Sequence, residues 1–169
     1  MRTDLFWIPG PWPGRLAIAP RPRGGDWLED EIRAWRSEGV DAVASLLVPE
    51  EIADLDLSEE PRLARANDIE FLSFPIRDRS VPAPDDAALE FATNIADRLA
   101  DGKKVVIHCR QGIGRAALVA ISVLLVSSGG AFEEVIEQVA AARGVGVPET
   151  PEQRRWLEKF AAGLKLVSP

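Results

Sequence analysis

The sequence has 169 residues, of which 46% are hydrophobic and 28% are charged. This balance is typical of a soluble globular protein, and we expect residues 1–169 to form a single domain with its own core. The formal net charge of -7 argues against nonspecific binding to nucleic acid or to an anionic membrane surface. A phosphate-bearing ligand would therefore have to be attracted by local positive charge.

Cysteine usage and the amino terminus indicate where the protein acts. The single cysteine cannot form a disulfide within the chain, which excludes a disulfide-stabilised secreted domain. The opening stretch, MRTDLFWIPGPWPGRLAIAPRPRGG, lacks the apolar segment of a signal peptide, and no stretch of the sequence reads as a membrane span. We predict a cytoplasmic protein, favour a monomer, and expect neither a membrane nor a nucleic-acid partner.

The first half of the chain alternates predicted strands and helices. In order, the patterns predict an irregular segment, a strand, a helix, a buried strand, two helical pieces around Pro61 and a further strand, at residues 1–14, 16–19, 27–38, 41–48, 50–67 and 69–76. Pro20 would end the first strand, and Gly39 is placed to cap the first helix.

The second half is mostly helical. The patterns predict a helix, a short buried strand and three further helices, at residues 85–101, 104–107, 116–128, 132–143 and 150–166. Asp85 can cap the first of these helices, and the helix over 116–128 is apolar on nearly every side, as expected at the centre of a domain. The alternation predicts an α/β fold with a mainly parallel central sheet flanked by helices.

Four tryptophans are interpreted as packing residues. No Lys or Arg residues are interleaved among them as they are on a surface that stacks nucleic-acid bases. These residues are Trp12, Trp27, Trp35 and Trp156.

A glycine-containing loop between the last predicted strand and the apolar helix carries the candidate chemistry. Gly112 and Gly114 allow backbone N–H groups to turn inward, and the loop runs into a helix amino terminus, so the segment predicts an anion cradle. Arg115 closes the loop with a planar fork that fits two phosphate oxygens. The expected phosphate-binding residues are Arg110, Gln111, Gly112, Ile113 and Gly114.

Cys109 stands at the mouth of this cradle. The donors that favour a bound phosphate also favour a thiolate, and a thiolate beneath a phosphate is a nucleophile in line with phosphorus. His108, the only histidine, is predicted to set the geometry of the loop rather than to transfer protons.

The stretch HCRQGIGR resembles the HCxxxxxR signature of protein tyrosine phosphatases and dual-specificity phosphatases. The chain is also similar to the small atypical dual-specificity phosphatases through PGRLAIAPRP, GVDAVASLL, FPIRDRSVPAP and RGVGVPETPEQ, which together extend over nearly all of it. The resemblance implies attack by Cys109, a cysteinyl-phosphate held by Arg115 and the loop amides, and hydrolysis by water. It implies no metal and no other cofactor.

The resemblance also indicates where the proton donor lies. Asp78, in FPIRDRSVPAP, matches the family's general acid, although an aspartate in such a loop commonly forms a turn. Gln153 matches the second glutamine of the loop that positions the hydrolytic water, while Glu149 replaces the first. Gln153 could equally be the capping-box partner of Thr150. Whether Asp78 or Glu149 is the acid stays open.

Ala116 departs from the family pattern, which has Ser or Thr directly after the arginine. Without that hydroxyl, release of phosphate from Cys109 is expected to be slow, at a cost of roughly 3 kcal/mol.

The leading interpretation is a phosphatase acting on a phosphorylated protein or a small phosphomonoester. Phosphotyrosine is the main expectation, with phosphoserine, phosphothreonine and inositol phosphates left open. The alternative is a phospholigand-binding module with weak turnover; sulfur transfer or arsenate reduction ranks lower.

Overall fold

The computed structural model describes residues 4–84 and 86–167. Its strands form one sheet and are β1 (Phe6–Ile8), β2 (Arg15–Ala19), β3 (Ala42–Ser45), β4 (Glu70–Ser73) and β5 (Lys104–His108). They lie in the order β1-β2-β5-β3-β4, and β1 pairs antiparallel with β2 while the other three pairs are parallel. The predicted mainly parallel sheet is confirmed, with β5 at its centre.

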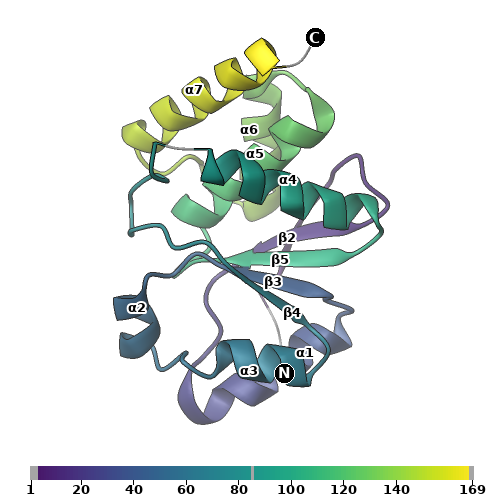
Figure 1. Ribbon diagram of the computed structural model, residues 1–169, viewed down its shortest axis with the longest axis vertical. Helices are drawn as coiled ribbons and strands as arrows, with labels where there is room; N and C mark the ends of the chain where they lie inside the picture. Colours follow the sequence, from purple (N-terminus) through teal and green to yellow (C-terminus); the bar gives the residue numbers. More distant parts are fainter. Residues whose placement is uncertain (1–3, 85, 168–169) are drawn as a thin grey trace.

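Helices cover both faces of this sheet. A short 3-10 helix over Gly25–Trp27 is followed by α1 (Leu28–Ser37), α2 (Pro49–Asp54), α3 (Glu60–Ala66), α4 (Ala87–Ala100), α5 (Gly114–Ser128), α6 (Phe132–Arg143) and α7 (Pro151–Val167). Figure 1 shows α4 to α7 on one side of the sheet and α1 to α3 on the other. The predicted flanked α/β architecture is therefore confirmed. Within the two described ranges, no helix is both long and apolar enough to cross a membrane.

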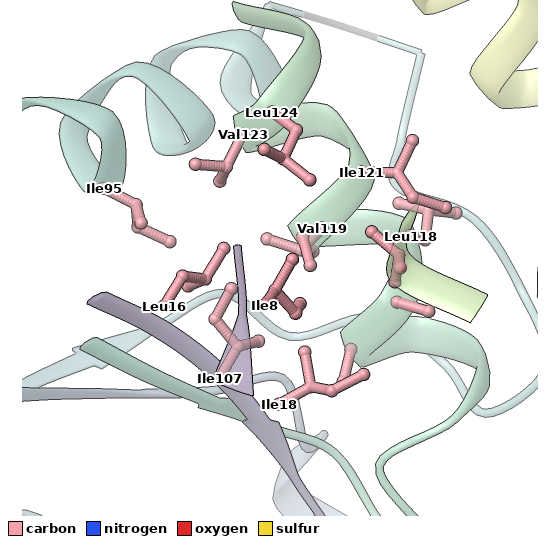
Figure 2. Packing of buried hydrophobic residues seen from close by; sticks show 14 of the residues in the cluster. Ile8, Leu16, Ile18, Ile95, Ile107, Leu118, Val119, Ile121, Val123 and Leu124 are labelled. Carbon is pink, nitrogen blue, oxygen red and sulfur yellow. The ribbon is translucent and has the colours of Figure 1, made fainter. Parts of the chain in front are cut away.

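The alternation of side chains along β5 divides the core in two. Val105, Ile107 and Cys109 belong to the cluster on the α5 face, whereas Val106 belongs to the cluster on the α1 face. Figure 2 shows α5 side chains such as Leu118 and Val119 packed over the sheet residues Ile18 and Ile107. Since α5 is buried against the sheet and against α4, α6 and α7, its sequence is apolar on nearly every side.

The edge strand β1 lies in the segment predicted to be irregular, so that prediction was wrong for Phe6–Ile8. A strand of three residues is too short to show an alternating pattern, and it is held by its pairing with β2. Pro9 and Gly10 follow it directly, which limits its length.

The two helical pieces expected around Pro61 do form, but the break lies elsewhere. Residues 55–59 separate α2 from α3, and Pro61 is in the first turn of α3, where its missing N–H is not needed. The strands predicted over 41–48 and 69–76 are shorter because their apolar residues continue beyond the paired part. Leu46 and Leu47 are fully buried after β3 has ended.

The remaining predictions differ only in detail. Asp85, the predicted cap of α4, lies outside the described residues, and α5 begins at Gly114 instead of residue 116. Trp35 is buried as expected, but Trp27 is 54% exposed beneath the Arg23 guanidinium. The packing interpretation was therefore wrong for Trp27.

Candidate active site

The parallel strands end on one edge of the sheet and bring three chain segments together there. Cys109 directly follows β5, α2 follows β3, and the segment containing Asp78 follows β4. Open α/β sheets bind ligands outside the carboxyl ends of their strands, so the topology places the candidate residues where a site is expected.

A pocket of about 190 Å³ lies at this edge. It is lined by Asp78, Arg79, Cys109, Arg110, Gln111, Ile113, Gly114, Arg115 and Glu149. The fold thus brings together most of the predicted site residues. The exceptions are Gly112, His108 and Gln153, which lie behind or beside the pocket and contact the segments that form it.

The loop from Cys109 to Ile113 has its carbonyl groups fixed from outside. Four successive carbonyl oxygens accept hydrogen bonds. The Cys109 carbonyl accepts from His108 Nδ1 at 3.3 Å, and the Arg110 carbonyl accepts from the backbone N–H of Arg21 at 3.2 Å. Arg143 donates to the next two, from Nη2 to the Gln111 carbonyl at 3.3 Å and from Nε to the Gly112 carbonyl at 2.8 Å. In a trans peptide unit the N–H points opposite to the carbonyl. The N–H groups of residues 110–113 are therefore directed away from these donors, as an anion cradle requires.

Gly112 is the residue on which this turn depends. Its φ is +69°, and a Cβ there would lie 2.4 Å from the carbonyl carbon of Ala19. A side chain would be disfavoured both by the backbone conformation and by the adjacent β2 backbone.

Arg115 is 1% exposed and is held by three hydrogen bonds to two groups. Its Nη1 and Nη2 donate to the two carboxylate oxygens of Glu51 at 2.7 and 2.9 Å, and Nη1 also donates to the Ile76 carbonyl at 2.8 Å. Burial alone would lower the pKa of Arg115, but Glu51, Cys109 and Asp78 keep it raised. The guanidinium is thus a fixed positive charge at the floor of the pocket.

Glu51 was not identified from the sequence. Burial would raise its pKa, but the hydrogen bonds from Arg115 and from the Val48 N–H hold the pKa below its ordinary value of 4.5. The only local signal is a glutamate in the first turn of a helix, which predicts a capping contact. Its bidentate pairing with Arg115 depends on the fold.

Asp78 lies where the resemblance expects it. Its Oδ1 is 3.2 Å from Arg115 Nη2, and its side chain is 57% exposed at the pocket mouth. A turn does form here, closed by the backbone bond from Ser80 N–H to the Arg77 carbonyl, with Arg79 at φ +61°. The backbone closes that turn, and the Asp78 carboxylate lies beside Arg115.

Glu149 and Gln153 connect the start of α7 to the Asp78 segment. Glu149 Oε1 accepts from Arg79 at 3.1 Å, and its Oε2 lies 2.3 Å from where a Cβ on Gly114 would stand. Gln153 is fully buried; its Oε1 accepts from the N–H groups of Glu149 and Thr150, and its Nε2 donates to the Ser80 carbonyl at 3.2 Å. Gln153 therefore makes the capping contact and also contacts the segment that carries Asp78.

His108 faces away from the pocket. Its Nε2 is 2.6 Å from Glu60 Oε1, and its ring lies 6.0 Å from that of Trp35, both on the α1 and α3 side of the sheet. The Cys109 carbonyl can only accept, so Nδ1 donates in their contact. This arrangement supports a role in loop geometry. Glu60, the buried partner on α3, carried no signal in the sequence.

Two further observations bear on the chemistry. Ala116 is fully buried and presents a methyl group directly after Arg115. Within residues 4–84 and 86–167, no three His, Cys, Asp or Glu side chains are grouped so that they could hold a metal ion.

Comparisons with curated proteins give partial matches. The chain is 28% identical over 165 residues to protein 197R of Invertebrate iridescent virus 6, which is named as a tyrosine phosphatase, covering 92% of this chain and 56% of that protein. It is 31% identical over 71 residues to cyclin-dependent kinase inhibitor 3 of Mus musculus, covering 42% of this chain and 34% of that protein. The chain thus spans about half the length of the first relative and a third of the second.

Solved structures share the fold. Kinase associated phosphatase, with serine in place of its catalytic-site cysteine, gives a TM-score of 0.87 at 21% identity, covering 98% of this chain and 97% of that chain. Tk-PTP in its active form gives 0.78 at 29% identity, covering 96% and 99%. PTPMT1 in complex with PI(5)P gives 0.76 at 20% identity, covering 91% and 94%.

The family match spans much of the chain. Residues 52–162, which contain the Asp78 segment, the cysteine loop and the start of α7, match the family of dual specificity phosphatase catalytic domains. This range is more than half of the sequence. The chain therefore belongs to the dual specificity phosphatase family.

Proposed function

We propose that this protein is a cysteine-dependent phosphatase that hydrolyses phosphomonoesters through a cysteinyl-phosphate, with phosphotyrosine in proteins as its main substrate. One observation carries the proposal: Cys109 and Arg115, at the two ends of one loop, line the same pocket as Asp78, which comes from a separate segment. Membership of a phosphatase family supports it. The pocket offers a nucleophile, a buried cation and a carboxyl group for one reacting phosphate.

In the first step, the Cys109 thiolate attacks phosphorus and the bond from phosphorus to the leaving oxygen breaks. Arg115 and the N–H groups of the loop hold the equatorial oxygens. Asp78, at the pocket mouth, gives its proton to the leaving oxygen. The products of this step are the free alcohol or phenol and a cysteinyl-phosphate.

In the second step, water attacks phosphorus and the sulfur leaves as a thiolate. The Asp78 carboxylate, which lost its proton in the first step, takes one from the water. Inorganic phosphate then departs. Because Ala116 offers no hydroxyl to the departing sulfur, this step is proposed to be the slower one.

The test is turnover of p-nitrophenyl phosphate and of a phosphotyrosine peptide. We expect sustained release of phosphate by the wild type and loss of turnover in Cys109→Ser, since a serine hydroxyl is a far weaker nucleophile at neutral pH. Arg33→Met, which removes a cation from the exposed surface of α1, serves as the control and should keep full activity. Turnover that survives in Cys109→Ser would reject the proposal.

A phospholigand-binding module with weak turnover is the second candidate. It is favoured by Ala116, which offers no hydroxyl to the departing sulfur, and by Glu149, which lines the pocket where the resemblance expects the first glutamine of the loop that positions the hydrolytic water. Rapid-mixing measurements with p-nitrophenyl phosphate separate the two. Release of one equivalent of nitrophenol followed by almost no further release supports the binding module, whereas continued release supports the enzyme.

A phosphoinositide is an alternative substrate. A second cavity of about 400 Å³ adjoins the pocket, shares Asp78 and Arg110 with it, and is also lined by Arg77. These arginines could receive a second anionic group, and the structurally similar PTPMT1 was solved with PI(5)P. Phosphate release from PI(5)P at a higher kcat/KM than from phosphotyrosine peptides would favour this alternative.

A further inference from the structure

Arg143 contacts the phosphate loop without lining the pocket. It is the last residue of α6, and its Nε and Nη2 donate to the Gly112 and Gln111 carbonyls at 2.8 and 3.3 Å. Its guanidinium carbon lies 4.0 Å from the ring centroid of Phe6 on β1. One planar group thus bridges α6, the edge strand and the loop.

These two hydrogen bonds set the direction of two N–H groups. The Gln111 carbonyl shares a peptide unit with the Gly112 N–H, and the Gly112 carbonyl shares one with the Ile113 N–H. With both carbonyls turned toward Arg143, both N–H groups point the opposite way. Gln111 and Ile113 line the pocket and Arg143 does not. The two N–H groups, which point away from Arg143, are therefore directed toward the side on which an anion would bind.

We infer that Arg143, held against Phe6, is a positioning residue that presents the Gly112 and Ile113 N–H groups to a bound phosphate. Gly112, at φ +69°, joins the two peptide units that carry these N–H groups. Because glycine has more backbone freedom than other residues, the two units need an outside contact to fix their orientation. A lysine could supply only one compact charge, whereas the guanidinium donates to two carbonyls and stacks on the ring at once.

The inference gives β1 a part in the site. Phe6 lies outside residues 52–162, the range that matches the family, and outside the pocket lining. Its contact with Arg143 nevertheless places the edge strand behind the phosphate loop. A substitution at Phe6 should therefore alter anion binding although the side chain cannot touch the anion.

The experiment measures anion binding in single variants. This inference rests on the proposed function, and orthovanadate is the probe because it resembles phosphate. Its affinity is measured from inhibition of p-nitrophenyl phosphate turnover and, independently of turnover, from the shift it causes in thermal unfolding. The variants are Arg143→Met, Arg143→Lys and Phe6→Leu, with Arg33→Met as a control that removes the same charge from an exposed helix. Circular dichroism verifies folding at the assay temperature.

We expect vanadate to bind Arg143→Met about tenfold or more weakly, because two charge-assisted bonds to the loop are lost. Arg143→Lys should recover part of the loss, Phe6→Leu should weaken binding by about threefold, and Arg33→Met should match the wild type. A purely structural role would lower the unfolding temperature in all three test variants and leave vanadate affinity unchanged. That result would overturn the inference.

The remaining outcomes are also decisive. If Arg143→Met does not fold, Arg143→Lys and Phe6→Leu decide, and wild-type affinity in both would overturn the inference. Vanadate binding without turnover in the wild type would reject the proposed enzyme but still test the loop through the thermal shift. Absence of both binding and turnover would reject the two together.

Discussion

At position 116 a methyl group stands where the family resemblance expects a hydroxyl, and it is fully buried. Ala116→Ser is expected to raise the steady rate by up to about a hundredfold, because a hydroxyl can stabilise the departing thiolate. The initial burst should not change, since the proposed attack by Cys109 relies on the loop amides and Arg115 and not on residue 116. Stopped-flow measurement with p-nitrophenyl phosphate separates the two phases.

Ala117→Ser is the matched control for this substitution. Ala117 is also fully buried and lies one residue further along α5. The Ala117→Ser substitution therefore adds the same hydroxyl to the same helix, but not directly after Arg115. A steady rate that stays at the wild-type value in Ala116→Ser would show that the missing hydroxyl does not limit turnover.

Glu51 links the stability of the protein to acid pH. Its folded pKa is below 4.5, so its contribution is fully present above that value and is lost as the pH falls through the folded pKa. Glu51→Gln should lower the free energy of unfolding at pH 7 by about 3 kcal/mol, because Arg115 loses its charged partner. The gap between wild type and variant should narrow below pH 4.5.

Urea denaturation at several pH values measures this difference. Glu29→Gln is the control, since Glu29 pairs with Arg33 on the exposed face of α1 and its loss should matter much less. A gap that stays constant from pH 7 down to the acid limit of folding would contradict the role assigned to Glu51.

Among the elements, the start of α7 contacts the segment that carries Asp78, through the hydrogen bond from Gln153 to the Ser80 carbonyl. In Gln153→Glu the carboxylate can still accept from Glu149 and Thr150, but the donor to the Ser80 carbonyl is lost. We expect kcat to fall more with phenyl phosphate than with p-nitrophenyl phosphate, because only the poorer leaving group depends strongly on the acid. Steady-state assays with both esters provide the measurement.

The corresponding control is Gln153→Ala, which removes the cap as well. It should show the same dependence on the leaving group together with a lower unfolding temperature, because the buried Gln153 side chain loses three hydrogen bonds. Equal losses with both esters in Gln153→Glu would indicate that the contact with Ser80 does not place the acid.

The bounds of helices whose first and last residues are typical caps could be predicted from the sequence almost to the residue. Gly144 ends α6 in the left-handed conformation, and Thr150 with Pro151 begins α7. The strand β1 could not be predicted, because what makes it a strand is the neighbouring β2 and not its own residues. The apolar runs around β3 and β4 report burial, which extends beyond the backbone pairing.

For the whole molecule, the net charge of -7 opposes the approach of an anionic substrate. We expect kcat/KM for an acidic phosphopeptide to rise about twofold between 20 and 200 mM salt, as screening weakens the long-range repulsion. A phosphopeptide of the same length with basic flanking residues should show a fall over the same range. A fall with the acidic peptide would mean that the arginines around the pocket dominate its approach.

The candidate site could be predicted from the sequence only where it is contiguous. Cys109, the glycines and Arg115 follow one another in a single loop, and the resemblance added Asp78. Glu51, Glu60 and Arg143 come from three different helices and meet the loop only after folding. Each is an ordinary charged residue on an ordinary helix, so no local pattern distinguishes it.

The pairing of Arg115 with two carboxylates has a consequence for the order of events. In this structure Nη2 lies beside both Glu51 Oε2 and Asp78 Oδ1. An arriving phosphate competes for that nitrogen, and the exposed Asp78 can yield more easily than the buried Glu51. Binding of substrate would thus displace the carboxyl group of Asp78, the proposed proton donor, from Arg115, so that a single guanidinium would couple docking of the phosphate to release of this carboxyl group.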